Sequence, residues 1–226
     1  MNQAIIPLFF DNHIVVCNKP NGLLTEASGT TQDSLEEQAK QWVKIKYNKP
    51  GNVFLTPIHR IDKPVSGIVV FAKNSKALTR LNRLIQDKQT RKIYWAWVEG
   101  LVTADEAELE HFVFHDQFYA RIVQPSLPQA KLARLRYRTL ARQSQHNRSL
   151  LEIQLFTGRY HQIRVQLAAI GHPVLGDVKY GSQQRYYTNA IALHHKILQM
   201  KHPVSQAECL FEAPLPANFA QCEFII

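Results

Sequence analysis

The first third of the chain alternates between short apolar runs, turn-forming residues and apolar positions at helical spacing. Residues 14–17 are apolar and β-prone, and residues 18–22 are typical of a turn, which predicts a strand and then a loop. From Ser34 to Tyr47 apolar residues recur at helical spacing, so we expect a helix there with Asp33 as its cap. Trp42 lies on the apolar face of that helix and is expected to pack.

A polar segment lies between two apolar runs. Residues 53–58 and 67–72 are apolar, which predicts two buried strands. The polar residues 59–66 between them are then a loop that is fixed at both ends. The same criteria predict a helix capped by Asn74 or Ser75 and ending near Asp87, strands over residues 93–98 and 150–156, a helix over residues 161–170, and short strands within residues 191–226.

Three arginines alternate with mostly apolar residues over residues 134–139. Arg134, Arg136 and Arg138 would share one face of a strand, because successive side chains of a strand point to opposite faces. Residues 117–151 contain no acidic residue. This pattern predicts a basic sheet face that contacts phosphates. The alternative is a solvated strand whose arginines pair with acidic residues from elsewhere in the chain.

The composition adds a preference for polyanionic partners. The 226 residues include 27 Lys and Arg against 18 Asp and Glu, a formal net charge of +9. This charge favours nucleic acid, although an anionic membrane surface would attract it too. No apolar run reaches membrane-spanning length, and the N-terminal residues do not resemble a signal peptide. Cys17, Cys209 and Cys222 are far apart, which fits reduced thiols, so we expect a cytoplasmic protein.

The polar loop at residues 59–66 has the most evident chemistry. Asp62 lies near Arg60 in a segment that is fixed between two predicted strands. A carboxylate beside an arginine can be a structural ion pair or a catalytic group, and these residues alone leave both open. The histidines match no metal-ligand spacing, and no phosphate-binding glycine pattern is present. We therefore expect neither a metal nor a nucleotide cofactor.

Four ordered segments resemble the motifs of RluA-type pseudouridine synthases. Residues 59–67 (HRIDKPVSG), continued by Ala72-Lys73, resemble the family pattern HRLD..TSG....AK. Residues 18–23 (NKPNGL) resemble the NKP.GL loop, and residues 92–100 (KIYWAWVEG) resemble the strand pattern K.Y.A.V.G. Residues 157–164 (TGRYHQIR) resemble TGRTHQIR and are followed, in the expected order, by GHPVLGD and Tyr180-Gly181. Four motifs in order are far more specific than one short pattern.

The resemblance covers about residues 11–216, and none of its departures removes a charged residue: they are Ile61, Val65, Tyr160 and Gln166. It implies an α+β fold, the pseudouridine synthase fold, with a long mixed and mostly antiparallel sheet, flanking helices and a central RNA-binding cleft. We expect residues 1–226 to form a single catalytic domain without an appended S4-like RNA-binding domain. The implied activity is the cofactor-free isomerisation of uridine to pseudouridine in structured ribosomal or transfer RNA, with base flipping.

The resemblance also implies roles for individual residues. Asp62 would be the essential carboxylate that acts at the ribose, and Arg164 its ion-pair partner; without the motif, Arg164 could equally bind phosphate. Tyr94 would stack on the uracil and assist loss of the C5 proton, whereas the strand alone would make it a core residue. Arg60 would occupy the space that the flipped base leaves; without the motif, it could be a loop arginine in a local salt bridge. Further RNA contacts are expected at His59, Lys19, Arg134, Arg136, Arg138 and His161.

Two other classes of function fit parts of the same sequence. A non-catalytic RNA-binding or RNA-folding module would use the basic surface without chemistry, and a phosphodiesterase-like hydrolase would use the histidines. In the leading hypothesis the partner is a ribosomal or transfer RNA stem-loop, bound by a monomer that has no membrane partner.

Overall fold

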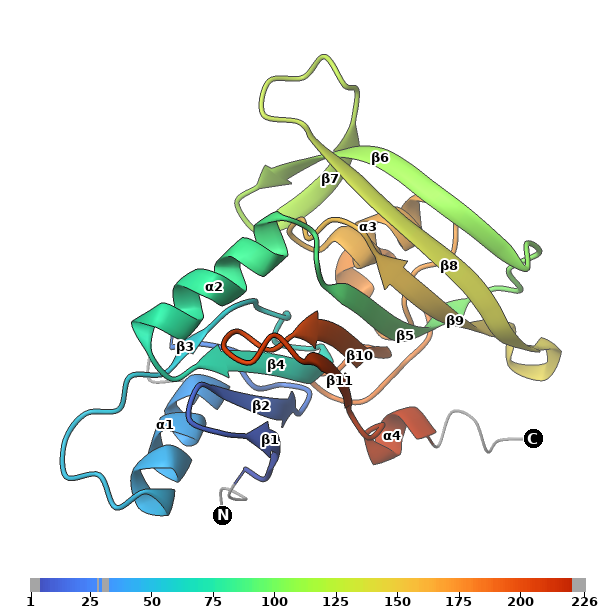
Figure 1. Ribbon diagram of the computed structural model, residues 1–226. Helices are drawn as coiled ribbons and strands as arrows, with labels where there is room; N and C mark the ends of the chain where they lie inside the picture. The colour runs from blue at the N-terminus through green and yellow to red at the C-terminus, as the bar shows by residue number, and fades with distance from the viewer. Residues whose placement is uncertain (1–4, 28, 30–32, 221–226) are drawn as a thin grey trace. The chain divides into compact units, whose positions relative to one another are not determined.

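A computed structural model of the chain describes residues 5–27, 29 and 33–220. These residues divide into two units, whose helices and strands are labelled in Figure 1. Unit 1 combines residues up to Arg91 with residues from His195 onward, and unit 2 comprises Lys92–His194. Both units pair strands antiparallel and carry helices, which is the α+β class expected from the sequence. That residues 1–226 act as a single catalytic domain stays a prediction.

Unit 1 contains strands from both ends of the chain. In its sheet, β2 (Ile14–Lys19) pairs antiparallel with β1 (Pro7–Phe10) and with β4 (Ser66–Ala72). All of β4 is buried, as its uninterrupted apolar run predicts. The short strand β3 (Thr56–Pro57) also pairs antiparallel with β4. Toward the C-terminal end, β10 (Leu193–Lys201) pairs antiparallel with β11 (Glu208–Glu212). The short helix α4 (Ala217–Ala220) follows.

Two longer helices of unit 1, α1 (Leu35–Lys46) and α2 (Ser75–Gln86), form where the apolar spacing predicts them. The Oγ of Ser34 caps α1 by accepting a backbone N–H of the first turn at 3.2 Å, so the predicted cap, Asp33, is wrong by one residue. The side chain of Asn74 caps α2 in the same way at 2.8 Å, which confirms one of the two predicted caps.

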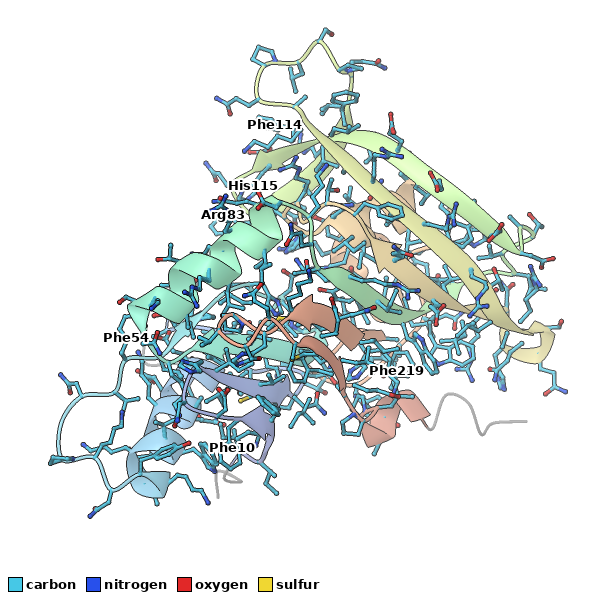
Figure 2. The ribbon with its side chains drawn as sticks, in the orientation of Figure 1. Phe10, Phe54, Arg83, Phe114, His115 and Phe219 are labelled. Atoms are coloured by element: carbon cyan, nitrogen blue, oxygen red, sulfur yellow. The ribbon has the colours of Figure 1, made fainter. Side chains whose placement is uncertain are left out.

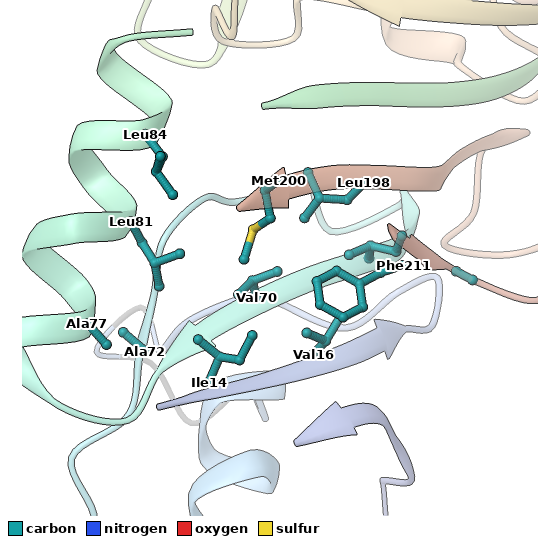
Figure 3. Packing of buried hydrophobic residues seen from close by; sticks show 12 residues of the cluster. Ile14, Val16, Val70, Ala72, Ala77, Leu81, Leu84, Leu198, Met200 and Phe211 are labelled. Carbon is teal, nitrogen blue, oxygen red and sulfur yellow. The ribbon is translucent and has the colours of Figure 1, made fainter. Parts of the chain in front are cut away.

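The hydrophobic core of unit 1 lies between α2 and the sheet (Figure 3). Leu81 and Leu84 point from α2 toward Val70 of β4, and all three are buried. On α1, Trp42 packs edge-on against Phe10 of β1, with ring centroids 4.9 Å apart, as its place on the apolar face predicts.

Unit 2 is built on an antiparallel sheet in the order β5–β9–β8–β6–β7. Val165 of the helix α3 packs against Val113 and Ala120 of this sheet, so α3 covers one of its faces. The elements are β5 (Arg91–Glu99), β6 (Glu106–Asp116), β7 (Tyr119–Val123), β8 (Lys131–Gln143), β9 (Arg148–Leu155), α3 (Gln162–Ala169) and two short 3₁₀ helices, η1 (Ser144–His146) and η2 (Val178–Tyr180).

The strands differ from the prediction in two places. The apolar run at residues 53–58 forms only the two-residue strand β3, and Phe54 within it is exposed, so the run is not the buried strand expected. The hairpin of β6 and β7 was not predicted. Its first strand alternates glutamates with less polar residues instead of presenting an apolar run, because one of its faces is solvated.

Candidate active site

The loop between β3 and β4 holds Asp62 between two buried neighbours. Ile61 and Val65 are both buried, whereas Asp62 is partly exposed. The backbone N–H of Val65 donates to the carbonyl of Asp62 at 3.0 Å and closes a turn. The backbone of Asp62 is therefore fixed while its side chain stays partly accessible.

The segment after β2 holds this loop through hydrogen bonds to its backbone. The Oγ1 of Thr25 donates to the carbonyl of Ile61 at 2.8 Å and accepts from the N–H of Ile61 at 3.3 Å. The N–H of Gly22 donates to the carbonyl of Lys63 at 2.8 Å. The NKPNGL segment with the residues after it and the loop at residues 59–66 are thus joined by hydrogen bonds next to Asp62.

Lys19 is completely buried, and its expected contact with RNA stays a prediction. Its ammonium group donates to the carbonyls of Pro20, Leu23 and Lys63 at 3.0, 2.6 and 3.1 Å. Burial lowers the pKa of Lys19 to about 7, while attraction to the carboxylate of Asp62 acts in the opposite direction. Lys19 therefore links the segment after β2 to the loop that carries Asp62, and its ionisable nitrogen lies near enough to interact with the Asp62 carboxylate.

Gly67 allows β4 to approach the backbone of β10. Its φ is +115°, and a Cβ there would lie 2.4 Å from the carbonyl oxygen of His195. Beside it, the rings of His59 and His195 meet edge-on, with centroids 5.4 Å apart. The Nε2 of His59 accepts the N–H of Val70 at 3.4 Å, so His59 supports the loop as expected, and its contact with RNA stays a prediction.

Arg60 extends from the same loop toward solvent. Its Nη1 donates to the Oε1 of Glu26 at 2.5 Å, and the Arg60 side chain is 71% exposed. The exposure agrees with a residue that can meet a macromolecule, and the predicted role of Arg60 in filling the space of a flipped base stays a prediction.

Tyr94 lies within β5 of unit 2 and is buried. It pairs with Ile153 of β9. This position fits both the active-site role that the motif implies and the core role that the strand pattern implies, so the stacking of Tyr94 on a base stays a prediction.

Arg164 forms a buried bidentate ion pair on α3. Its Nε and Nη2 donate to the two carboxylate oxygens of Asp177 at 2.6 and 2.7 Å, and the side chains are 6% and 1% exposed. The guanidinium also lies over the ring of Tyr180, 5.0 Å from its centroid. Asp62 belongs to unit 1, and its pairing with Arg164 stays a prediction.

His161 is held neutral immediately before α3. The hydroxyl oxygen of Tyr180 accepts the N–H of Ala120 at 2.8 Å and lies 2.7 Å from the Nδ1 of His161, within hydrogen-bond distance. Burial, together with the nearby cations Arg164 and Lys179, lowers the pKa of His161 to about 3. The buried imidazole supports the start of α3, and a contact of His161 with RNA stays a prediction.

Tyr160, a departure from the family pattern, joins two histidine rings. It stacks on His161 with centroids 3.8 Å apart, and on His115 with centroids 3.9 Å apart. His115 is the last residue but one of β6 (Figure 2). The three rings connect the start of α3 to the sheet of unit 2.

The arginines of β8 do not form the purely basic face that the sequence predicts. Arg134, Arg136 and Arg138 are exposed on one face, as their alternation implies, but each lies opposite a glutamate of β6. Arg136 contacts Glu108 at 2.9 Å and Arg134 contacts Glu110 at 3.2 Å, while Arg138 contacts Glu152 of β9 at 3.0 Å. Acidic residues outside residues 117–151 thus balance the charge, and RNA contacts of these arginines stay a prediction.

Four residues that contact predicted site residues or their sequence neighbours were given no role by the sequence analysis. Asp177 and Tyr180 fall within segments that match the family motifs, which was the signal that could have found them. Thr25 and Glu26 follow the NKPNGL segment and carried no signal, because only the folded chain brings them beside Ile61 and Arg60.

Within residues 5–27, 29 and 33–220, no group of three or more His, Cys, Asp or Glu could hold a metal ion. No helix in these ranges is long and apolar enough to cross a bilayer. Cys17 and Cys209 are free thiols, and Cys222 lies outside the described residues.

A family model described as RNA pseudouridylate synthase matches residues 13–169. The dual-specificity RNA pseudouridine synthase RluA of Pasteurella multocida is 32% identical over 206 residues, covering 91% of this chain and 90% of the relative. The ribosomal large subunit pseudouridine synthase D of Vibrio cholerae is 32% identical over 228 residues, covering 95% of this chain and 68% of the relative. A solved structure, human RNA pseudouridylate synthase domain containing 4, superposes with a TM-score of 0.77 at 22% identity, covering 95% of this chain and 90% of that one.

The solved structure confirms the predicted fold, and the sequence matches decide among the three classes of function considered above. Because the family model spans more than half of the chain and the relatives align along most of it, the chain belongs to the RNA pseudouridylate synthase family and is an isomerase.

Proposed function

We propose that this enzyme isomerises uridine in a stem-loop of ribosomal or transfer RNA, with Asp62 as the essential carboxylate. The observation that carries the proposal is the loop at residues 59–66. It presents a partly exposed Asp62 between buried neighbours, and the backbone on either side is held by Thr25, Gly22 and Lys19. A catalytic group needs such a fixed backbone because a small displacement of the reacting side chain lowers the reaction rate strongly.

The reaction can be written without an external reagent. The bond between C1′ and N1 of the nucleotide breaks, the base rotates, and a bond forms between C1′ and C5. C5 then loses its proton and N1 gains one, so atoms and electrons balance without a metal or cofactor. The ionised oxygen of Asp62 acts at the ribose while the glycosidic bond is broken, as carboxylates do in glycoside cleavage.

The other motif residues complete this proposal. Tyr94 stacks on the uracil and assists loss of the C5 proton, and Arg164 supports the charge of Asp62. A stacked uridine cannot present its ribose to a protein carboxylate, so the base is extruded at a cost of about a few kcal/mol. Arg60, exposed and on the same loop as Asp62, fills the vacated space.

The names of the relatives support the choice of RNA. One is called a dual-specificity enzyme and another a ribosomal large subunit enzyme. A short stem-loop read by its shape fits a chain of this size. We expect the enzyme to act on it as a monomer in the cytoplasm.

The decisive experiment is Asp62→Asn, a change that removes the charge and keeps the shape. Pseudouridine would be mapped across total RNA from cells with the wild-type gene, with the variant and with neither. We expect the wild type to add pseudouridine at defined positions, and Asp62→Asn to lower the rate at those positions by about 10²- to 10⁴-fold or more while leaving RNA binding largely intact.

The matched control is Asp87→Asn, which changes an exposed aspartate at the end of α2 and should leave the rate unchanged. Isomerisation by Asp62→Asn at close to the wild-type rate would refute the role of Asp62. A wild type that binds RNA but adds no pseudouridine would refute the proposed activity of this chain.

A further inference from the structure

The ion pair between Arg60 and Glu26 has no part in the chemistry proposed above. It joins Nη1 of Arg60 to Oε1 of Glu26 at 2.5 Å, with the side chains 71% and 37% exposed. Both residues belong to unit 1, and they are 34 positions apart in the sequence.

The fold places these two side chains together. Thr25, which precedes Glu26, is bonded in both directions to Ile61, which follows Arg60. Thr25 and Ile61 are buried, so this double hydrogen bond fixes the backbone beside each member of the pair. The carboxylate and the guanidinium therefore meet beside this hydrogen-bonded pair of residues, and Arg60 is two residues before the partly exposed Asp62.

We propose that Glu26 is a positioning residue that holds Arg60 in the RNA-free enzyme and releases it when a uridine is extruded. This inference rests on the proposed function, in which Arg60 fills the space of the extruded base. The N–H of Arg60 that is donated to Glu26 is not available to RNA, so the carboxylate and the acceptors of the RNA compete for one guanidinium.

The strength of the pair fits a contact that is made and released. Exposed ion pairs typically change an equilibrium constant by about 1.4- to fivefold, because water and salt screen them. Such a pair keeps Arg60 in place before RNA arrives and is weak enough for phosphate and base acceptors to displace. Removal of the carboxylate should therefore speed extrusion by a factor in the same range.

The test is Glu26→Gln, which removes the charge and keeps the size. The probe is a synthetic RNA stem-loop that carries a uridine identified by the mapping experiment, with 2-aminopurine as its neighbour. The fluorescence of 2-aminopurine rises when the target base leaves the stack, so stopped-flow mixing reports the extrusion rate. We expect Glu26→Gln to raise this rate about 1.4- to fivefold over the wild type.

The matched control is Glu208→Gln, which removes one negative charge from an exposed position on β11 in the same unit. It should change the rate by less than about 1.4-fold, the lower limit for an exposed pair. An unchanged or slower rate in Glu26→Gln, or an equal increase in Glu208→Gln, would overturn the role of Glu26. Isomerisation of the probe by the wild type is scored separately, so failure of the proposed function is distinguishable.

Discussion

Lys19 and Arg164 show that the environment of a charged residue decides what it does. Each lies in a family motif, and each is buried against specific oxygen atoms: Lys19 against three backbone carbonyls, and Arg164 against both oxygens of Asp177. Buried charges persist only where such partners replace water. The two residues therefore organise the backbone and the helix that carry the motif residues, whatever they add to the chemistry.

At this scale we predict that Asp177→Asn lowers the free energy of unfolding by about 3–5 kcal/mol. The change leaves the guanidinium of Arg164 buried without its counter-charge. The matched variant is Asp105→Asn, because Asp105 also pairs with an arginine, Arg142, at 2.7 Å but is 89% exposed. Asp105→Asn should lower the free energy of unfolding by less than about 1 kcal/mol. Urea denaturation of both variants measures the difference, and equal losses would contradict the prediction.

At the scale of elements, β6 and β8 form a ladder of opposite charges. Glu108 accepts from Arg136 at 2.9 Å and lies 3.7 Å from Arg134, so one glutamate serves two arginines. The register of the two strands places Glu106, Glu108 and Glu110 opposite Arg138, Arg136 and Arg134. Cross-strand pairs of opposite charge stabilise a sheet, and like charges in the same places destabilise it.

We therefore predict that Glu108→Lys lowers the free energy of unfolding by about 1 kcal/mol at low salt. The loss should shrink in about 1 M salt, where the Debye length falls to about 3 Å. Glu208→Lys, at an exposed position on β11, should change stability by less than about 0.5 kcal/mol. Thermal unfolding at the two salt concentrations checks both. A loss for Glu108→Lys that is independent of salt would point to packing as its cause.

The elements differed in how far the sequence predicts them. The helices α1 and α2 were predicted to within one or two residues, because apolar spacing and capping residues are local signals. The hairpin of β6 and β7 was missed because it has one solvated face and its pairing is not local. The predicted strand was right in its alternation, but its arginines lie opposite glutamates of β6, since alternation does not tell which strand lies alongside.

At the scale of the whole molecule, the net charge of +9 favours association with RNA. Each phosphate that the protein neutralises contributes a slope of roughly −0.7 to −0.9 to a plot of log affinity against log salt. We predict that affinity for a fluorescein-labelled RNA stem-loop falls about tenfold or more between 50 and 200 mM salt, which corresponds to about two or more neutralised phosphates. Fluorescence anisotropy measures this, and an affinity that does not change with salt would contradict it.

The sequence by itself determined the family, the α+β class, the main helices and the loop that carries Asp62. Those conclusions rest on motif order and local periodicity, which depend only on the order of residues along the chain. Only the tertiary structure decided that Lys19 is buried, that Arg164 pairs with Asp177, and that Glu26 meets Arg60. Periodicity specifies the face on which a side chain lies. Its partner is set by which distant segment packs there, because burial and charge pairing depend on three-dimensional neighbours.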